Sequence, residues 1–182
     1  MVLPESMMVD DFIWTDSTFI VRSGYAIYTL DRINEPLMVF DSYDYDIFPK
    51  DKNHLYIVSH QGDSSLLFLA NLKVKRAKRL LKVGEEIVCV SALGESTIVV
   101  TSENIYLFKG KECTRCLNMW APLRTAVMID RGLVFATDNE ICLLTGVDKF
   151  MLMFEAKTKK LLYDGLYLYI QLTEGDLVRV KS

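Results

Sequence analysis

Two cysteines separated by two residues form the pair in this sequence that is best suited to redox or metal chemistry. Cys113 and Cys116 make a C-x-x-C motif. A redox-active pair would need a helix N-terminus beside a βαβ pattern to lower the thiol pKa, and the surrounding residues predict no helix. A structural zinc site would need a second Cys or His pair, and His54 and His60 lie far upstream. The motif therefore favours a turn that leads into an outer strand, with a metal site as the alternative.

A short acidic stretch offers a second set of candidate metal ligands. Asp41, Asp44 and Asp46 alternate with tyrosines. Carboxylate oxygens suit Ca²⁺, but the stretch lacks the glycine and the distal glutamate of an EF-hand loop. We therefore expect a solvated loop here rather than a calcium site. His60 is a further weak metal-ligand candidate, and its even spacing from His54 puts both rings on one face of a strand.

A basic segment interrupts a chain whose net charge is −3. Such local charge can attract an acidic protein surface, a phospholipid headgroup or nucleic acid. No aromatic residue is interleaved to stack on bases, so we expect no nucleic-acid partner. The alternative is an exposed edge strand on which charge discourages pairing with other chains. The six basic residues are Lys73, Lys75, Arg76, Lys78, Arg79 and Lys82.

Sequence motifs that would identify an enzyme are not found. The sequence contains no Gly-rich phosphate loop, no G-x-S-x-G elbow and no H-E-x-x-H motif. These absences disfavour an enzyme and give no reason to expect a cofactor. They do not exclude the hypothesis that the protein is an enzyme, because a catalytic site can be assembled from several repeats.

The hydrophobic pattern indicates whether the chain contains a membrane-spanning segment or a secretory signal. The hydrophobic fraction is 51%, yet the apolar runs are only a few residues long, far below the roughly 20 residues of a membrane-spanning helix. The first residues show neither a basic region nor a long apolar core, so no secretory signal is evident. The sequence as written predicts a cytoplasmic protein, with export after removal of a signal peptide as the alternative.

The elements that must position these residues belong to a repeat. One pattern occurs five times: an apolar run, a polar turn and a second apolar run. It is typical of consecutive antiparallel strands. The copies start at Thr18, Leu55, Thr97, Leu133 and Leu166, with spacings of 37, 42, 36 and 33 residues. This period is typical of four-stranded β-sheets repeated along a chain.

Each copy is preceded by an inner strand, and the first four are followed by an outer strand. Inner strands are predicted at 8–14, 45–48, 87–93, 126–129 and 161–163. Outer strands are predicted at 37–40, 79–83, 116–120 and 150–154. A single domain over 1–182 is expected, with blades at 7–40, 43–83, 85–120, 123–156 and 159–182. Residues 1–6 are the candidate segment to close the fifth copy, which has no outer strand of its own.

The repeat resembles a β-propeller of the broad class that includes WD-type and NHL-type propellers, over essentially all 182 residues. The WD class would call for a Trp-Asp dipeptide in each blade, whereas Trp14 and Trp120 are followed by Thr15 and Ala121. The resemblance therefore implies an all-β architecture of about five short antiparallel blades, or a partial propeller, and no catalytic residues. A β-sandwich is the structural alternative.

Three functions follow as hypotheses. The leading one is a non-enzymatic protein-binding or scaffold module, because the repeat carries no recurrent polar signature. The second is a hydrolase or metal-dependent enzyme whose site is assembled from several blades at the central channel. The third is a partial propeller completed by a second chain, which would form a homodimer through open blade edges.

Overall fold

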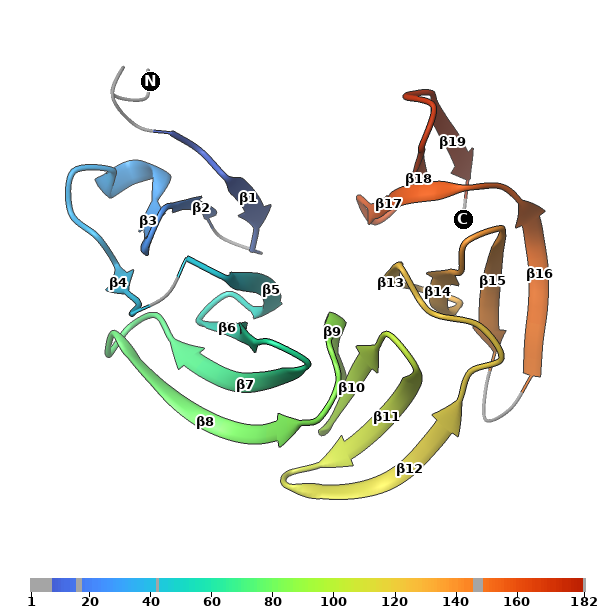
Figure 1. Ribbon diagram of the computed structural model, residues 1–182. Helices are drawn as coiled ribbons and strands as arrows, with labels where there is room; N and C mark the ends of the chain where they lie inside the picture. The colour runs from blue at the N-terminus through green and yellow to red at the C-terminus, as the bar shows by residue number, and fades with distance from the viewer. Residues whose placement is uncertain (1–7, 16–17, 42, 146–148, 182) are drawn as a thin grey trace. The chain divides into compact units, whose positions relative to one another are not determined.

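The structure, a computed structural model, describes residues 8–15, 18–41, 43–145 and 149–181. Over these residues it contains five antiparallel sheets and one short 3-10 helix, η1 (Leu30–Arg32) (Figure 1). Four of the sheets have four strands and one has three. The prediction of an all-β fold built from about five short antiparallel propeller blades is confirmed. The segment 1–6 that was predicted to close the fifth blade lies outside the described residues.

Every sheet is formed by strands that are consecutive in the chain, from an inner first strand to an outer last strand. The first sheet contains β1 (Asp11–Trp14), β2 (Phe19–Ser23), β3 (Ala26–Thr29) and β4 (Met38–Val39). The second contains β5 (Tyr45–Asp51), β6 (His54–Gln61), β7 (Ser64–Asn71) and β8 (Arg76–Val83). The third contains β9 (Ile87–Leu93), β10 (Ser96–Thr101), β11 (Asn104–Lys109) and β12 (Glu112–Asn118).

The fourth sheet contains β13 (Thr125–Ile129), β14 (Gly132–Ala136), β15 (Glu140–Thr145) and β16 (Lys149–Glu155). The fifth contains β17 (Thr158–Tyr163), β18 (Tyr167–Leu172) and β19 (Leu177–Lys181). Each strand predicted from the sequence overlaps one of these strands, and the boundaries differ by a few residues.

The described residues up to Gly84 form one compact unit, called unit 1 below. It holds the first two sheets, whose facing sides share a core. Ile20 and Ile27 of the first sheet pack with Leu55 and Ile57 of the second, and all four are at most 1% exposed. Because side chains alternate between the two faces of a strand, each sheet can bury one face here and keep polar residues on the other.

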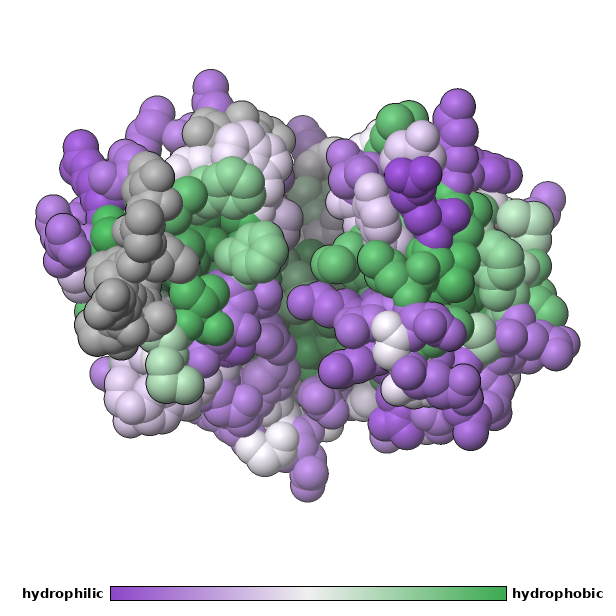
Figure 2. Space-filling view, turned by 90° about the horizontal axis from the view of Figure 1, so that it is seen from above, coloured by the Kyte–Doolittle hydropathy of each residue, from purple (hydrophilic) through white to green (hydrophobic). Residues whose placement is uncertain are grey.

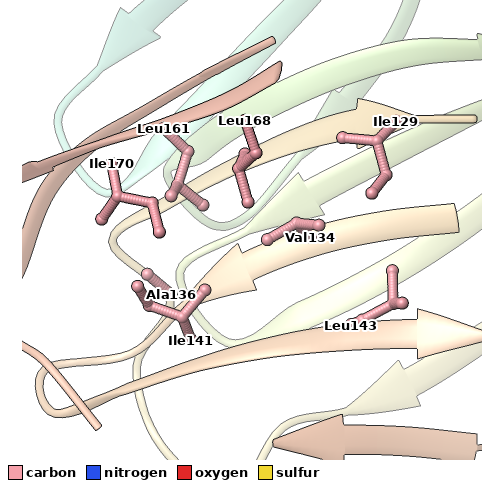
Figure 3. Packing of buried hydrophobic residues seen from close by; sticks show 8 residues of the cluster. All are labelled: Ile129, Val134, Ala136, Ile141, Leu143, Leu161, Leu168 and Ile170. Atoms are coloured by element: carbon pink, nitrogen blue, oxygen red, sulfur yellow. The ribbon is translucent and has the colours of Figure 1, made fainter. Parts of the chain in front are cut away.

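The residues from Glu85 onward form a second compact unit, unit 2, with the remaining three sheets. Among the first strands of these sheets, β13 contacts both β9 and β17. Between the fourth and fifth sheets lies a cluster of buried aliphatic side chains, which includes Val134 and Leu143 of the fourth sheet and Leu161, Leu168 and Ile170 of the fifth (Figure 3). This sheet-on-sheet packing removes apolar area from water on each interior face, which is the main stabilising contribution of such small blades.

The outer strands β8, β12 and β16 share a feature that the sequence did not predict. Each contains one β-bulge against its neighbour, and the extra residue is Leu80 in β8, Thr114 in β12 and Met153 in β16. A bulge bends a strand and increases its twist, which makes an exposed edge a poorer template for pairing.

The structure corrects the prediction for the cysteine pair. Cys113 and Cys116 lie within β12 rather than in a turn that leads into it. The hairpin turn comes earlier, at Gly110 and Lys111, because Gly110 adopts φ +63°, a left-handed conformation that glycine reaches without a Cβ clash. Among the described residues, no helix is long and apolar enough to cross a bilayer.

Candidate functional site

The basic segment forms an exposed edge in unit 1, and all six of its predicted residues are exposed. Lys73 and Lys75 lie in the turn between β7 and β8, and the other four lie on β8. Asn71 holds this turn, since its side-chain oxygen accepts the backbone N–H groups of Lys73 and Val74 at 3.0 and 3.2 Å. We call these six residues the basic strand: Lys73, Lys75, Arg76, Lys78, Arg79 and Lys82.

The basic strand carries charge on both faces of its sheet. Lys78 lies opposite Leu69, whereas Arg79 lies opposite Phe68, on the face that packs toward the first sheet. The bulge at Leu80 shifts the register, so that Lys82 falls on the same face as Arg79. β8 is also the last strand of its sheet. The result is an edge that presents positive charge in two directions.

A hollow of about 580 Å³ adjoins the start of the basic strand. Its lining includes Arg32, Glu35, Lys73 and Lys75, all within unit 1. The Lys75 Nζ donates to Glu35 Oε1 at 2.9 Å, and this hydrogen bond with the ammonium charge lowers the pKa of the Glu35 carboxyl. The pair links the segment before β4 to the turn before β8, and Asp31, Leu37 and Leu72 also line the hollow.

The predicted metal candidates of unit 1 separate into a loop and a hydrogen-bonded network. Asp41 and Asp44 are exposed in the connection before β5. Asp46 on β5 contacts His60 on β6, with Oδ2 and Nε2 at 3.0 Å, and the other ring nitrogen of His60 lies 3.4 Å from the Ser65 hydroxyl on β7. This network links three adjacent strands at one end of the sheet.

A Ser–His–Asp order is also that of a hydrolytic triad, so the exposure of its members is decisive. The Ser65 residue is 0% exposed, whereas the Asp46 side chain is 46% exposed. In a working triad the serine faces the substrate and the carboxylate lies behind the histidine. Here the order is reversed relative to solvent, so no substrate reaches the hydroxyl. The array fits a structural role in the sheet.

His54 makes an equivalent link at the other end of β6. Its Nδ1 lies 2.9 Å from Asp51 Oδ1, and its Nε2 lies 3.1 Å from the Asn71 side-chain nitrogen. Since the Asn71 oxygen accepts backbone N–H groups, its amide nitrogen donates to Nε2 and the His54 proton sits on Nδ1. Burial raises the pKa of Asp51, but the N–H of Asn53 and the His54 ring outweigh it and lower that pKa.

The two cysteines of the C-x-x-C motif in unit 2 hydrogen-bond within their own sheet. Cys113 and Cys116 are free thiols on the exposed strand β12. Burial, with the nearby Cys113, raises the pKa of the Cys116 thiol. A raised thiol pKa reduces the thiolate fraction of Cys116 at neutral pH. Across the described residues, no three His, Cys, Asp or Glu side chains come together as a metal site.

A polar cluster centred on Glu85 was missed by the sequence reasoning. Tyr106 and Asn104 donate to Glu85 Oε1 at 2.5 and 2.9 Å, and the Thr101 hydroxyl donates to the other oxygen. Burial raises the pKa of Glu85, but these three hydrogen bonds outweigh it and lower that pKa; burial and Glu85 together raise the pKa of Tyr106. With three donors the carboxylate is held in place and is poorly suited to act as a general base.

The outer strand β16 of unit 2 presents apolar side chains to solvent. Phe150, Met151, Leu152 and Phe154 are 39%, 44%, 51% and 38% exposed, and we call these four residues the apolar strand. In Figure 2, hydrophobic atoms lie at the right-hand margin, the side on which Figure 1 draws β16. The sequence signal was available, since no charge occurs between Lys149 and Glu155.

Aromatic packing anchors the apolar strand on the fourth sheet. Trp120, in the connection after β12, lies with its ring centroid 5.2 Å from that of Phe150. Both rings also contact Phe135, which is fully buried, at centroid distances of 6.0 and 5.8 Å. Trp120 is nevertheless 55% exposed and directs its indole N–H to Glu140 at 3.3 Å. It therefore extends the apolar surface beyond β16.

Comparison with known proteins adds evidence for the fold. No known family profile matches the sequence, and no curated protein matches it. Among solved structures, PorZ of Porphyromonas gingivalis, a bacterial surface component of the type-IX secretion system, superposes with a TM-score of 0.65 and 14% identity. BBS1N, crystallised in complex with ARL6DN, gives 0.63 and 12%, and the N-terminal domain of Nup159 gives 0.61 and 11%.

The coverage of these matches limits what can be concluded from them. They cover 96%, 100% and 96% of this chain, but 25%, 68% and 60% of PorZ, BBS1N and the Nup159 domain. This chain thus spans about a quarter of the length of PorZ. At such low identity the likeness concerns the fold alone, and the WD-type or NHL-type class stays a prediction. The comparisons and the five consecutive sheets agree on one conclusion: the chain has a β-propeller fold.

Proposed function

We propose that the protein is a non-enzymatic protein-binding module, and that the basic strand binds an acidic, extended segment of a partner protein. The observation that carries the proposal is the exposure of all six basic side chains on one sheet edge, in a chain of net charge −3. A concentrated field of one sign raises association rates with partners of the opposite sign and selects against partners of like sign.

The nature of the surface favours an acidic polypeptide over nucleic acid. Between Lys73 and Lys82 no aromatic side chain is available to stack on a base. The exposed large apolar residue in this stretch is Val74, which is 61% exposed and can contact an aliphatic side chain. Among chains of similar fold, BBS1N was crystallised in complex with another protein, ARL6DN. This is consistent with a binding role for a fold of this kind.

The polar clusters of the described residues support binding over catalysis. The Ser65 hydroxyl is buried, the Cys116 thiol has a raised pKa, and Glu85 is held by three donors. Each of these groups is better explained as part of the hydrogen bonding within a sheet than as a nucleophile or base. The hydrolase and metal-enzyme hypotheses have no comparable observation in their favour.

A glutamate-rich peptide of about ten residues, labelled with a fluorophore, tests the proposal by fluorescence anisotropy at several salt concentrations. We expect binding that weakens as salt rises, because exposed charges are screened. The triple variant K78E/R79E/K82E should bind at least about tenfold more weakly, since it reverses three of the charges that attract the peptide.

The matched control is K157E/K159E/K160E, which makes the same change of net charge at three exposed lysines of unit 2. It should change the affinity by less than about twofold, because long-range charge is screened within roughly 10 Å at 0.1 M salt. Equal losses in both variants, no peptide binding by the wild-type protein, or preferential binding of a single-stranded oligonucleotide of equal charge would each overturn the proposal.

A further inference from the structure

The bulge in β12 brings two thiols onto one face of an outer strand. Residues three apart in a regular strand point to opposite faces. In β12, however, Cys116 lies opposite Tyr106. Cys113 lies opposite Phe108, and Thr114 is the extra residue of the bulge. The rings of Tyr106 and Phe108 are neighbours, with centroids 5.9 Å apart. The two cysteines therefore share the face on which these rings lie.

A side-chain hydrogen bond holds the bulge in place. The extra residue of a bulge is left out of the regular ladder of backbone hydrogen bonds. Here the Thr114 hydroxyl donates to the carbonyl oxygen of Leu107 on β11 at 3.0 Å. The extra residue is thus attached to the neighbouring strand, and the relative position of the two cysteines is set by the backbone of β12.

The two thiols are close to each other and open to solvent. Cys113 Sγ lies 3.1 Å from the carbonyl oxygen of Arg115, the residue that precedes Cys116. Burial and then the neighbouring Cys113 raise the pKa of the Cys116 thiol, an effect that requires the two groups to be near each other. Both residues are exposed, and neither forms a disulfide. A ligand from solvent can therefore reach both sulfur atoms.

The number and type of donor atoms select the ligand. Thiolates prefer soft cations, of which Cu⁺ and Zn²⁺ are the common ones. Zn²⁺ takes four ligands in structural sites. Within the residues that the structure describes, no three His, Cys, Asp or Glu side chains come together. Cu⁺ accepts two thiolates in a nearly linear arrangement, so it is the cation that a pair of thiols can satisfy.

We infer that Cys113 and Cys116 of one chain bind a single Cu⁺ ion through their two sulfur atoms. Binding breaks both S–H bonds and releases two protons, and the copper keeps its oxidation state. Thr114 is a positioning residue of this site, since it holds the bulge that brings the thiols together. The site lies on β12 and does not depend on the function proposed for β8.

Competition with bicinchoninate, which forms a coloured complex with Cu⁺, tests the inference on reduced protein in the absence of oxygen. The wild-type protein should take up one Cu⁺ per chain. C113S and C116S should each bind Cu⁺ at least about 100-fold more weakly, because the second bond to the metal forms within one molecule. C113S/C116S, which keeps the buried Cys89 and Cys142, should not compete.

Two further pairs of variants test the geometry. R115C/C116S keeps the number of thiols but moves one to the opposite face, since Arg115 lies opposite Leu107. It should bind Cu⁺ no better than C116S. T114V removes the hydroxyl that holds the bulge and should weaken binding by about tenfold, as is typical for a residue that orients a metal ligand. T114S, which keeps the hydroxyl, should bind like the wild-type protein.

K78E/R79E/K82E should also bind Cu⁺ like the wild-type protein, so this inference and the β8 proposal can fail separately. Circular dichroism should show unchanged strand content in every variant. A reduced wild-type protein that does not compete with bicinchoninate, uptake of one Cu⁺ by two chains, or wild-type affinity in R115C/C116S would overturn the inference. Equal binding by T114V and T114S would overturn the role of the bulge.

Discussion

The outer strands β8 and β16 occupy the same place in their sheets and yet present opposite surfaces. Both are last strands, both pair antiparallel with the preceding strand, and both contain one bulge. β8 carries four basic residues, whereas β16 has charge only at its two ends. The backbone of a blade thus leaves its outermost side chains open to vary, and that is where we place the specific functions of this chain.

The same contrast extends to what lies beneath each strand. Phe150 of the apolar strand rests on the buried Phe135, so β16 is coupled to the core of its sheet. The charged residues of β8 are exposed, and Phe68, which lies opposite Arg79, is only partly buried. Substitutions near the apolar strand should therefore affect stability, whereas substitutions in the basic strand should affect binding alone.

The largest effect is expected for F135A. Removal of a fully buried phenylalanine leaves a cavity and takes away the support of Trp120 and Phe150, which should cost about 3–5 kcal/mol of unfolding free energy. Urea denaturation followed by tryptophan fluorescence measures this. F150A, at a 39% exposed position, serves as the comparison and should cost clearly less. Equal losses in the two variants would contradict the coupling of β16 to the core.

An intermediate effect is expected for E85Q, which tests the polar cluster of unit 2. Hydrogen bonds to a charged group contribute about 1.5–3 kcal/mol, so E85Q should destabilise by about that amount at pH 7. E86Q, at the exposed neighbouring position, is the control and should lie within about 0.5 kcal/mol of the wild-type protein.

The pH dependence of E85Q follows from the lowered pKa of Glu85. A carboxyl whose pKa is lower in the folded state stabilises the fold fully above its unfolded pKa. That contribution is lost as the pH falls from the unfolded value, near 4.5, through the folded value. The difference between wild-type and E85Q unfolding free energies should therefore shrink below about pH 4.5. A difference that persists undiminished at pH 3 would show that the ionised carboxylate is not what stabilises the cluster.

The repeat could be predicted from the sequence because it depends on local patterns. Runs such as 97–101, rich in β-branched residues and followed by a polar turn, specify a strand wherever they occur. The exposure of Lys78 and Arg79 could also be predicted from the sequence, since charged residues on an outer strand are costly to bury. The predicted start of the third outer strand was late, because the left-handed turn at Gly110 allows pairing to resume at Glu112.

The polar networks and the bulges could not be predicted in this way. Glu85 and Tyr106 are 21 residues apart, and their hydrogen bond depends on the register of three strands. The bulge at Met153 shifts the register between β15 and β16 by one residue. No distinctive residue type marks such a bulge in the sequence. The exposure of the apolar strand could not be predicted for another reason: an apolar outer strand has the sequence of a buried one, and only the structure shows that solvent reaches it.

The smallest effect is expected for the stability of the triple variant K78E/R79E/K82E, which sharpens the comparison from the side of β8. The three side chains are exposed, and exposed substitutions usually change stability by less than about 0.5 kcal/mol each. Urea denaturation at 0.05 and 0.5 M NaCl measures the difference in unfolding free energy between the wild-type protein and the variant. This difference should stay within about 0.5 kcal/mol per substitution at both salt concentrations, and it should be smaller at 0.5 M, where salt screens the repulsion among the basic residues. If the unfolding free energy of the variant is several kcal/mol lower than that of the wild-type protein, the basic residues stabilise the fold. In that case β8, like β16, is coupled to the core of its sheet.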